Sequence, residues 1–142
     1  MYLMSATHQQ IGEWLGVRAP QTEQELLEII EERLPTTSVK RLLGLGITRA
    51  EVDGLVIPLR TLQHRRSRRE KLTVDESERV LRMARVLSQA ESVYESRERA
   101  LGWLRAPNPR CGKRSPIELL KTDAGSRIVE DLLIQIDEGM FV

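Results

Sequence analysis

Helical periodicity dominates the pattern of hydrophobic and polar residues in this 142-residue chain. Between residues 24 and 34, apolar side chains recur three and four positions apart, which predicts a helix with one buried face that ends before Pro35. A longer apolar stripe predicts a helix over residues 74–94. The members of this stripe are Val80, Ala84, Leu87 and Ala90. No alternation of useful length predicts a strand.

Shorter helices are predicted on both sides of the long one. Their ranges are 38–43, 49–55, 58–68, 98–104, 117–121 and 124–136. Residues 107–114 contain two prolines and a glycine, which predict a loop. Four helix starts carry the Ser/Thr-x-x-Glu pattern of a capping box, in which hydroxyl and carboxylate bind each other's backbone N–H groups. These pairs are Thr22/Glu25, Thr48/Glu51, Thr73/Glu76 and Ser115/Glu118. We therefore expect an all-α fold.

The change from short to longer helices predicts a domain boundary near Leu72–Thr73. An N-terminal helix-turn-helix lobe would then cover residues 1–72, and a C-terminal helical lobe would cover residues 73–142. At 40% hydrophobic residues, the chain can bury a core.

Composition argues against catalysis, metal binding and membrane insertion. The single cysteine, Cys111, excludes an internal disulfide and suits a reducing cytosol. His8 and His64 lack metal-ligand spacing with it, and neither a Gly-rich phosphate loop nor a nucleophile elbow is present. No apolar run approaches the ~20 residues of a membrane span, and the N-terminus lacks the features of a secretory signal. We expect a soluble cytoplasmic protein that is not an enzyme and has no cofactor.

Charge is segregated although the whole chain carries only +1. Residues 60–71 contain six basic side chains and one acidic side chain, whereas residues 115–142 contain six acidic and two basic ones. A basic strip suits a polyanion such as nucleic acid. An acidic end suits a basic protein surface. The chain therefore has two predicted partners of opposite charge.

Residues 48–69 can be interpreted as a helix-turn-helix, with helix 49–55, a turn at 56–58, and a second helix anchored by Leu59 and Leu62. Arg can bridge guanine and Gln can bridge adenine in the major groove, while arginines at the helix end would meet phosphates. The predicted DNA-binding residues are Arg60, Thr61, Gln63, His64, Arg65, Arg66, Arg68 and Arg69.

Two alternatives compete with this interpretation. The basic residues could form a solvated helix end and linker. Val56 also stands where many such motifs have Gly, so the turn could be distorted or the phasing could differ. In a second phasing, helix 39–45 and a turn at Gly46 precede a reading helix over 48–56. That helix would present Glu51 and Asp53 to DNA, so we rank it below the first.

The C-terminal half carries a series of motifs in a characteristic order. They are Leu72-Thr73-Val74-Asp75-Glu76-Ser77-Glu78-Arg79, Ala100, Trp103-Leu104, Pro107-Asn108, Pro116-Ile117-Glu118-Leu119-Leu120, Thr122-Asp123, Gly125, Val129-Glu130 and Gly139-Met140-Phe141. In this order and spacing, the chain resembles the toxin-binding domain of the Xre/MbcA/ParS antitoxins, which pair with RES-domain toxins. The resemblance is strong over residues 58–142 and looser before them.

The resemblance implies an all-helical homodimer that binds a RES toxin, whose activity degrades NAD, and covers its active-site cleft. It also implies an Xre-like N-terminal lobe that binds double-stranded operator DNA and represses the operon. The helix over 74–94 would be the dimer element, the central core helix, or both. The expected toxin-binding residues are Asn108, Leu120, Thr122, Asp137, Glu138, Gly139, Met140, Phe141 and Val142.

Several of the resembling residues also have structural explanations. Trp103 and Leu104 suit core anchors, Glu118 suits a helix cap, and only one of Leu119 and Leu120 is expected to face a partner. An antitoxin that also represses its operon is the leading hypothesis. The alternatives are a helix-turn-helix transcription factor without a toxin partner and a small helical scaffold that binds no nucleic acid.

Overall fold

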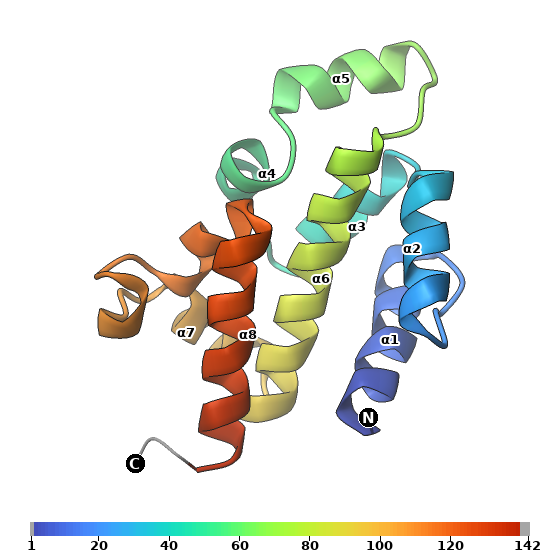
Figure 1. Ribbon diagram of the computed structural model, residues 1–142. Helices are drawn as coiled ribbons and strands as arrows, with labels where there is room; N and C mark the ends of the chain where they lie inside the picture. Colours follow the sequence, from blue (N-terminus) through green and yellow to red (C-terminus); the bar gives the residue numbers. More distant parts are fainter. Residues whose placement is uncertain (1, 140–142) are drawn as a thin grey trace. The chain divides into compact units, whose positions relative to one another are not determined.

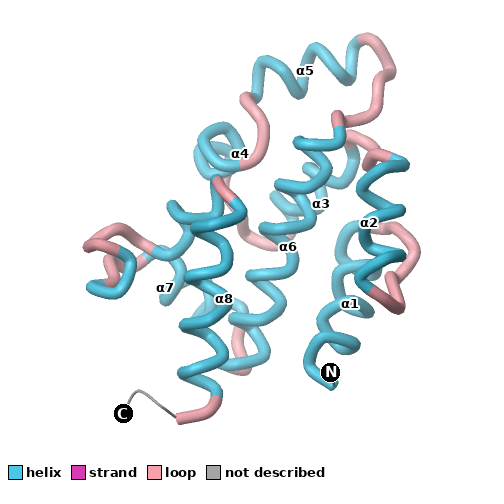
Figure 2. Tube along the Cα trace, viewed as in Figure 1, coloured by secondary structure: helices cyan, strands magenta, loops and turns pink. Residues whose placement is uncertain are grey.

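The computed structural model describes residues 2–139, which form helices joined by short loops with no strand among them (Figure 1; Figure 2). The α-helices are α1 (Tyr2–Leu15), α2 (Glu23–Glu32), α3 (Thr37–Gly44), α4 (Arg49–Leu55), α5 (Leu59–Ser67), α6 (Val74–Tyr94), α7 (Arg97–Arg105) and α8 (Asp123–Asp137). Two 3-10 helices, η1 (Pro109–Cys111) and η2 (Pro116–Lys121), lie between α7 and α8. The all-α prediction is confirmed.

Most predicted helices are present, with differences at their ends. Helices α4 and α6 have the predicted bounds. Helix α2 ends at Glu32, before the predicted residue 34, because Arg33 adopts a φ of 68° and donates its N–H to the Ile30 carbonyl at 3.0 Å. The Leu34 N–H donates instead to the Ser77 hydroxyl at 2.8 Å. A tertiary hydrogen bond therefore replaces the last helical one.

Helix α1 was not predicted. Its C-terminal half buries Ile11 and Leu15, four positions apart, and Gly16 follows it with a left-handed φ of 69°. The predicted loop over 107–114 contains one short 3-10 turn, η1. Residues 116–121 form a 3-10 helix rather than the predicted α-helix.

Two of the predicted capping boxes start α4 and α6, and both are reciprocal. The Glu51 N–H donates to the Thr48 hydroxyl at 3.1 Å, and the Thr48 N–H donates to the Glu51 carboxylate at 2.9 Å. The matching distances for Thr73 and Glu76 are 3.1 and 2.8 Å. Both pairs satisfy backbone donors that a helix start leaves without partners, which explains why α4 and α6 begin where the sequence predicts.

The predicted capping box at Ser115/Glu118 is also present at the start of η2, whereas the Thr22/Glu25 pair is only partly as predicted. The Thr22 hydroxyl accepts the Glu25 N–H at 3.1 Å, but the Glu25 carboxylate accepts the N–H of Gln21 rather than that of Thr22. At η2, the Glu118 carboxylate accepts both the N–H and the hydroxyl of Ser115, at 2.7 and 2.8 Å. These bonds lower the pKa of Glu118.

The chain divides into two compact units, residues 1–84 and 85–142, and the division falls within α6. In the first unit α1 packs against α3, α3 against α4, and α4 against α5. Its largest fully buried side chains are Ile11, Leu15, Leu34, Leu42, Ile47, Ile57, Leu72 and Met83. The predicted functional domains, residues 1–72 and 73–142, stay a prediction.

In the second unit η2 packs against both α7 and α8. The largest fully buried side chains are Leu87, Leu104, Leu120 and Leu133. Arg85 donates to the Glu130 carboxylate at 2.8 Å, and the Gln89 amide donates to the Glu130 carbonyl at 3.1 Å, which ties the second half of α6 to α8. Trp103 is half-buried, with its ring centroid 6.0 Å from that of Tyr94.

The apolar stripe of α6 lies entirely in the protein core. Val80, Ala84, Leu87 and Ala90 have no exposed surface. The interpretation of α6 as a core helix therefore accounts for the stripe, and a dimer role for this helix stays a prediction.

Candidate functional site

The start of α5 is fixed by α4 and by the buried turn that joins the two helices. The Leu59 N–H donates to the Asp53 carboxylate at 2.8 Å, so a residue of α4 caps α5. Val56 and Ile57 are buried in the turn. Val56 has a φ of −117°, a conformation that does not require glycine, so the turn forms with valine in place.

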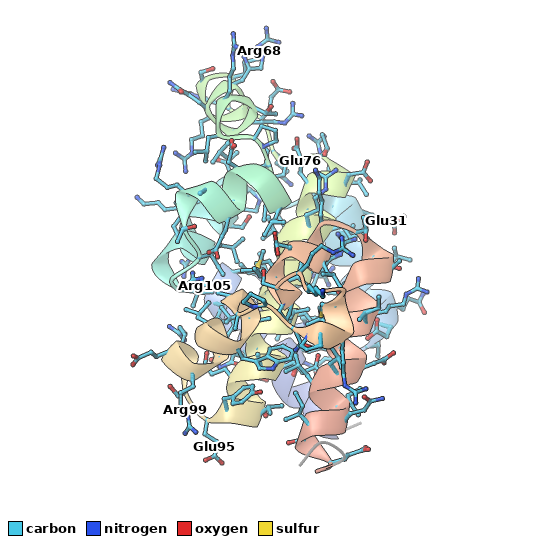
Figure 3. The ribbon with its side chains drawn as sticks, turned by 90° about the vertical axis from the view of Figure 1, so that its left-hand side faces the viewer. Glu31, Arg68, Glu76, Glu95, Arg99 and Arg105 are labelled. Carbon is cyan, nitrogen blue, oxygen red and sulfur yellow. The ribbon has the colours of Figure 1, made fainter. Side chains whose placement is uncertain are left out.

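Helix α5 presents one side outward and keeps the other against its own unit. Successive residues advance about 100° around a helix, so Arg60, Gln63 and His64 lie on one side, and all three are exposed. Thr61 and Arg65 lie further round the helix, toward the buried Leu62, and are half-buried. The remaining predicted DNA-binding residues, which are Arg66, Arg68 and Arg69, are exposed. Arg68 directly follows α5, and Figure 3 shows its side chain directed away from α6.

The sequence interpretation expected Arg65 to project outward, but in the structure its side chain turns toward α6. Its Nε and one terminal nitrogen each donate to a carboxylate oxygen of Glu76, both at 3.0 Å. This is a bidentate pair, and Glu76 is only 7% exposed. Burial raises the pKa of Glu76, but the hydrogen bonds from Arg65 and Thr73 outweigh that effect and hold the pKa below its ordinary value. Hydrogen bonding to Glu76 raises the pKa of Arg65.

A second residue of α6 contacts the turn before α5. One terminal nitrogen of Arg79 donates to the Val56 carbonyl at 3.1 Å. Glu76 and Arg79 are three positions apart and therefore lie on the same side of α6. The sequence interpretation missed both residues as partners of the basic helix. The available signal was the capping box at Thr73/Glu76, although that pattern does not name Arg65 as a third member.

The second phasing takes α4 as the reading helix, which would present a different set of charged side chains to DNA. Both acids that argued against it are engaged locally, Glu51 by Thr48 and Asp53 by Leu59. The exposed side of α4 nevertheless carries one cation, Arg49, whereas α5 and the residues after it carry several. Charge therefore still favours α5.

Polar residues of the predicted toxin-binding set cap local structure. The Asn108 side-chain oxygen accepts the Arg110 N–H at 3.0 Å and starts η1. The Thr122 hydroxyl accepts the Gly125 N–H at 3.0 Å and starts α8. Asn108 is half-buried and Thr122 is exposed.

Leu120 is 2% exposed, and Leu119 is buried as well. Neither leucine faces solvent, whereas the sequence interpretation left one of them for a partner. Their burial depends on Gly125, because a Cβ atom there would lie 2.0 Å from the Leu119 carbonyl oxygen. Glycine thus allows the start of α8 to approach the backbone of η2.

The predicted contact residues at the end of α8 are at the surface. Asp137, Glu138 and Gly139 are exposed, and Gly139 ends the helix with a φ of 72°. The predicted contacts at Met140, Phe141 and Val142 lie outside the described residues.

Metal binding and membrane insertion have no candidate elements within residues 2–139. No group of three or more His, Cys, Asp or Glu side chains in this range could hold a metal ion. None of the helices described there is both long and apolar enough to cross a membrane.

Two family descriptions match consecutive parts of the chain. Residues 25–85 match the antitoxin Xre-like helix-turn-helix domain, and residues 89–139 match the antitoxin Xre/MbcA/ParS C-terminal toxin-binding domain. The first match contains α5 and the residues that hold it. The second contains η2, α8 and the predicted toxin-binding residues up to Gly139.

Individual relatives agree with these matches. The chain is 43% identical over 84 residues to an Antitoxin Xre of Pseudomonas putida, a match that covers 59% of this chain and 53% of that protein. It is 33% identical over 98 residues to a Prs ADP-ribosylating antitoxin of a Sphingobium species, covering 63% and 62%. An Antitoxin Xre of Photorhabdus laumondii is 30% identical over 132 residues, covering 89% of this chain and 88% of that protein. The chain belongs to the Xre antitoxin family.

Proposed function

We propose that this protein is an antitoxin that neutralises a RES-type toxin and binds operator DNA to repress its own operon. The observation that carries the proposal is one chain in which an Xre-like helix-turn-helix region with an outward cationic helix precedes a toxin-binding region. On this proposal the protein has no catalysis of its own. The functional domains would be residues 1–72 and 73–142.

The exposed side of α5 supports the DNA-binding half of the proposal. Arg60, Gln63 and His64 would read base edges in the major groove, and the arginines at and beyond the helix end would contact phosphates. As a homodimer, the protein would place two such helices on a palindromic operator with half-sites about one helical turn apart.

The acidic end of α8 supports the toxin-binding half. A toxin that consumes NAD must bind the pyrophosphate, which favours basic groups in its cleft. Asp137 and Glu138 are exposed and could face such a cleft, together with the apolar residues 140–142. The name of the Sphingobium relative includes ADP-ribosylation of Prs. NAD degradation and ADP-ribosyl transfer both break the nicotinamide–ribose bond, so the same cleft chemistry serves either toxin.

Co-expression with a RES-domain toxin tests neutralisation. Cellular NAD should fall with the toxin alone and recover with the antitoxin, while labelled NAD would reveal any transfer of ADP-ribose to protein. Deleting residues 139–142 should abolish neutralisation and leave helicity unchanged. If the truncated protein still neutralises, the tail is not the inhibitory element.

Gel-shift titration with the DNA upstream of the operon tests repression. Neutralising about 4–6 phosphates gives a steep loss of affinity with salt. Arg60→Ala should weaken DNA binding and spare toxin neutralisation, because Arg60 lies on the exposed side of α5. Operator binding without any effect on a neighbouring toxin would instead favour a transcription factor without a toxin partner.

A further inference from the structure

Helix α5 has little apolar burial to fix its orientation. Leu62, at 4% exposed, is the buried residue of the helix, and Leu59 is only half-buried. Most of its other side chains are polar or charged. A helix that must hold several side chains against base edges needs a defined orientation, so other contacts have to supply it.

Polar contacts from α6 fix α5 near each of its ends. Near its C-terminal end, Arg65 forms the bidentate pair with Glu76, at 3.0 Å for both bonds. Before its N-terminal end, Arg79 holds the Val56 carbonyl at 3.1 Å. Glu76 lies in the first turn of α6 (Figure 3).

The Glu76 carboxylate also belongs to the capping box that starts α6. Its Oε1 atom accepts from the Thr73 N–H at 2.8 Å and from Arg65 Nε at 3.0 Å. The same oxygen therefore sets where α6 begins and where α5 is held. Because the pair is largely buried, neither group can be lost without leaving the other charge poorly compensated.

We propose that Glu76 and Arg79 are positioning residues for DNA recognition, and that Arg65 acts through Glu76 rather than by contacting DNA. The inference rests on the proposed DNA-binding role of α5. An acidic residue is then necessary for binding a polyanion. Arg65 orients the residues that contact DNA and does not contact DNA itself.

Charge alone predicts the opposite effect on DNA affinity when Glu76 is replaced. Replacing a carboxylate near a DNA-binding surface removes repulsion and should strengthen binding. Glu70 provides the matched control, because it is exposed and acts on Arg65 through its charge. We expect Glu70→Gln to leave operator affinity unchanged or to raise it slightly, and Glu76→Gln to lower it about tenfold.

The salt dependence separates positioning from contact. Loss of one phosphate contact changes the slope of log K against log salt by about one. Arg66→Ala should make that slope less steep, whereas Glu76→Gln and Arg65→Gln should lower affinity and leave the slope unchanged. The double variant Arg65→Gln/Glu76→Gln should bind no more weakly than either single variant, because both remove the same contact.

Amide hydrogen exchange tests the positioning contacts without DNA. We expect exchange within α5 to quicken in Glu76→Gln and in Arg65→Gln, which keeps the Thr73 capping box, so a folding defect in one variant leaves the other as the test. Unchanged exchange, or operator affinity that rises as in Glu70→Gln, would overturn the inference. A wild-type protein that binds no operator would refute the proposed DNA binding, while the exchange data would still decide whether these contacts hold α5.

Discussion

Gly125 is the position where a single methyl group should do the most damage. A Cβ atom there would lie 2.0 Å from the Leu119 carbonyl oxygen and 2.9 Å from the Leu119 carbonyl carbon. Both are backbone atoms, so they cannot rotate away as the end of a flexible side chain would. Ordinary contact begins at 3.4 Å, which means that the start of α8 would have to move by roughly 1.4 Å relative to η2.

Two opposing effects set the change in the free energy of unfolding for Gly125→Ala. Overpacking costs up to about 3 kcal/mol, and occasionally more, while alanine returns about 1 kcal/mol of helix propensity over glycine. We therefore expect Gly125→Ala to lower the free energy of unfolding by about 2 kcal/mol. For a chain of this size, the corresponding fall in Tm is about 8 °C.

Gly102→Ala is the matched control, because Gly102 lies within α7 and a Cβ there would meet nothing within 4 Å. This control should gain up to about 1 kcal/mol from helix propensity alone. Thermal and urea denaturation, followed by circular dichroism, would separate the two variants by about 3 kcal/mol. Gly125→Ala as stable as the control would refute the reasoning from close backbone approach.

Three further predictions test other parts of the structure. Leu62→Ala should cost about 2–5 kcal/mol in urea denaturation because the side chain is buried, whereas Leu27→Ala, at a site 53% exposed, should stay within about 0.5 kcal/mol; equal costs would contradict the packing of α5. The pKa of Glu76 is lowered in the folded state, so its contribution to stability is present above the unfolded pKa of about 4.3 and is lost as pH falls further. The stability difference between wild type and Glu76→Gln should therefore be constant from pH 7 to about pH 5 and shrink below about pH 4, and a difference that grows in acid would show the reverse linkage. Burial raises the pKa of the Cys111 thiol, which is 3% exposed, so a disulfide reagent should label it slowly in native protein and rapidly in denaturant; fast native labelling would show that the η1 loop opens.

Local rules account for the parts of the fold that the sequence predicts well. The starts of α4 and α6 follow from Thr48/Glu51 and Thr73/Glu76, because a capping box involves residues only three positions apart. The stop at Pro35 is equally local, although Arg33 ends α2 earlier than the proline requires. Such interactions depend on spacing along the chain and can be read without knowing the tertiary structure.

The side chains of the candidate site were harder to predict because tertiary partners decide their direction. Arg65 belongs to a basic strip by sequence, but a carboxylate 11 positions away turns it inward. Leu120 was expected at an interface, yet the close approach that Gly125 permits places both neighbouring leucines in the core. Periodicity identifies which residues form a helix, whereas the direction of each side chain depends on what packs beside it.

The division of the chain inside α6 constrains how the protein can be taken apart. A fragment that stops at Ala84 would cut the helix and leave its last carbonyls without partners, and one that starts at Arg85 would lack an N-cap. Shared fragments that each keep residues 74–94 avoid both losses. A chimaera that joins the DNA-binding region of one antitoxin to the toxin-binding region of another should therefore take all of α6 from a single parent.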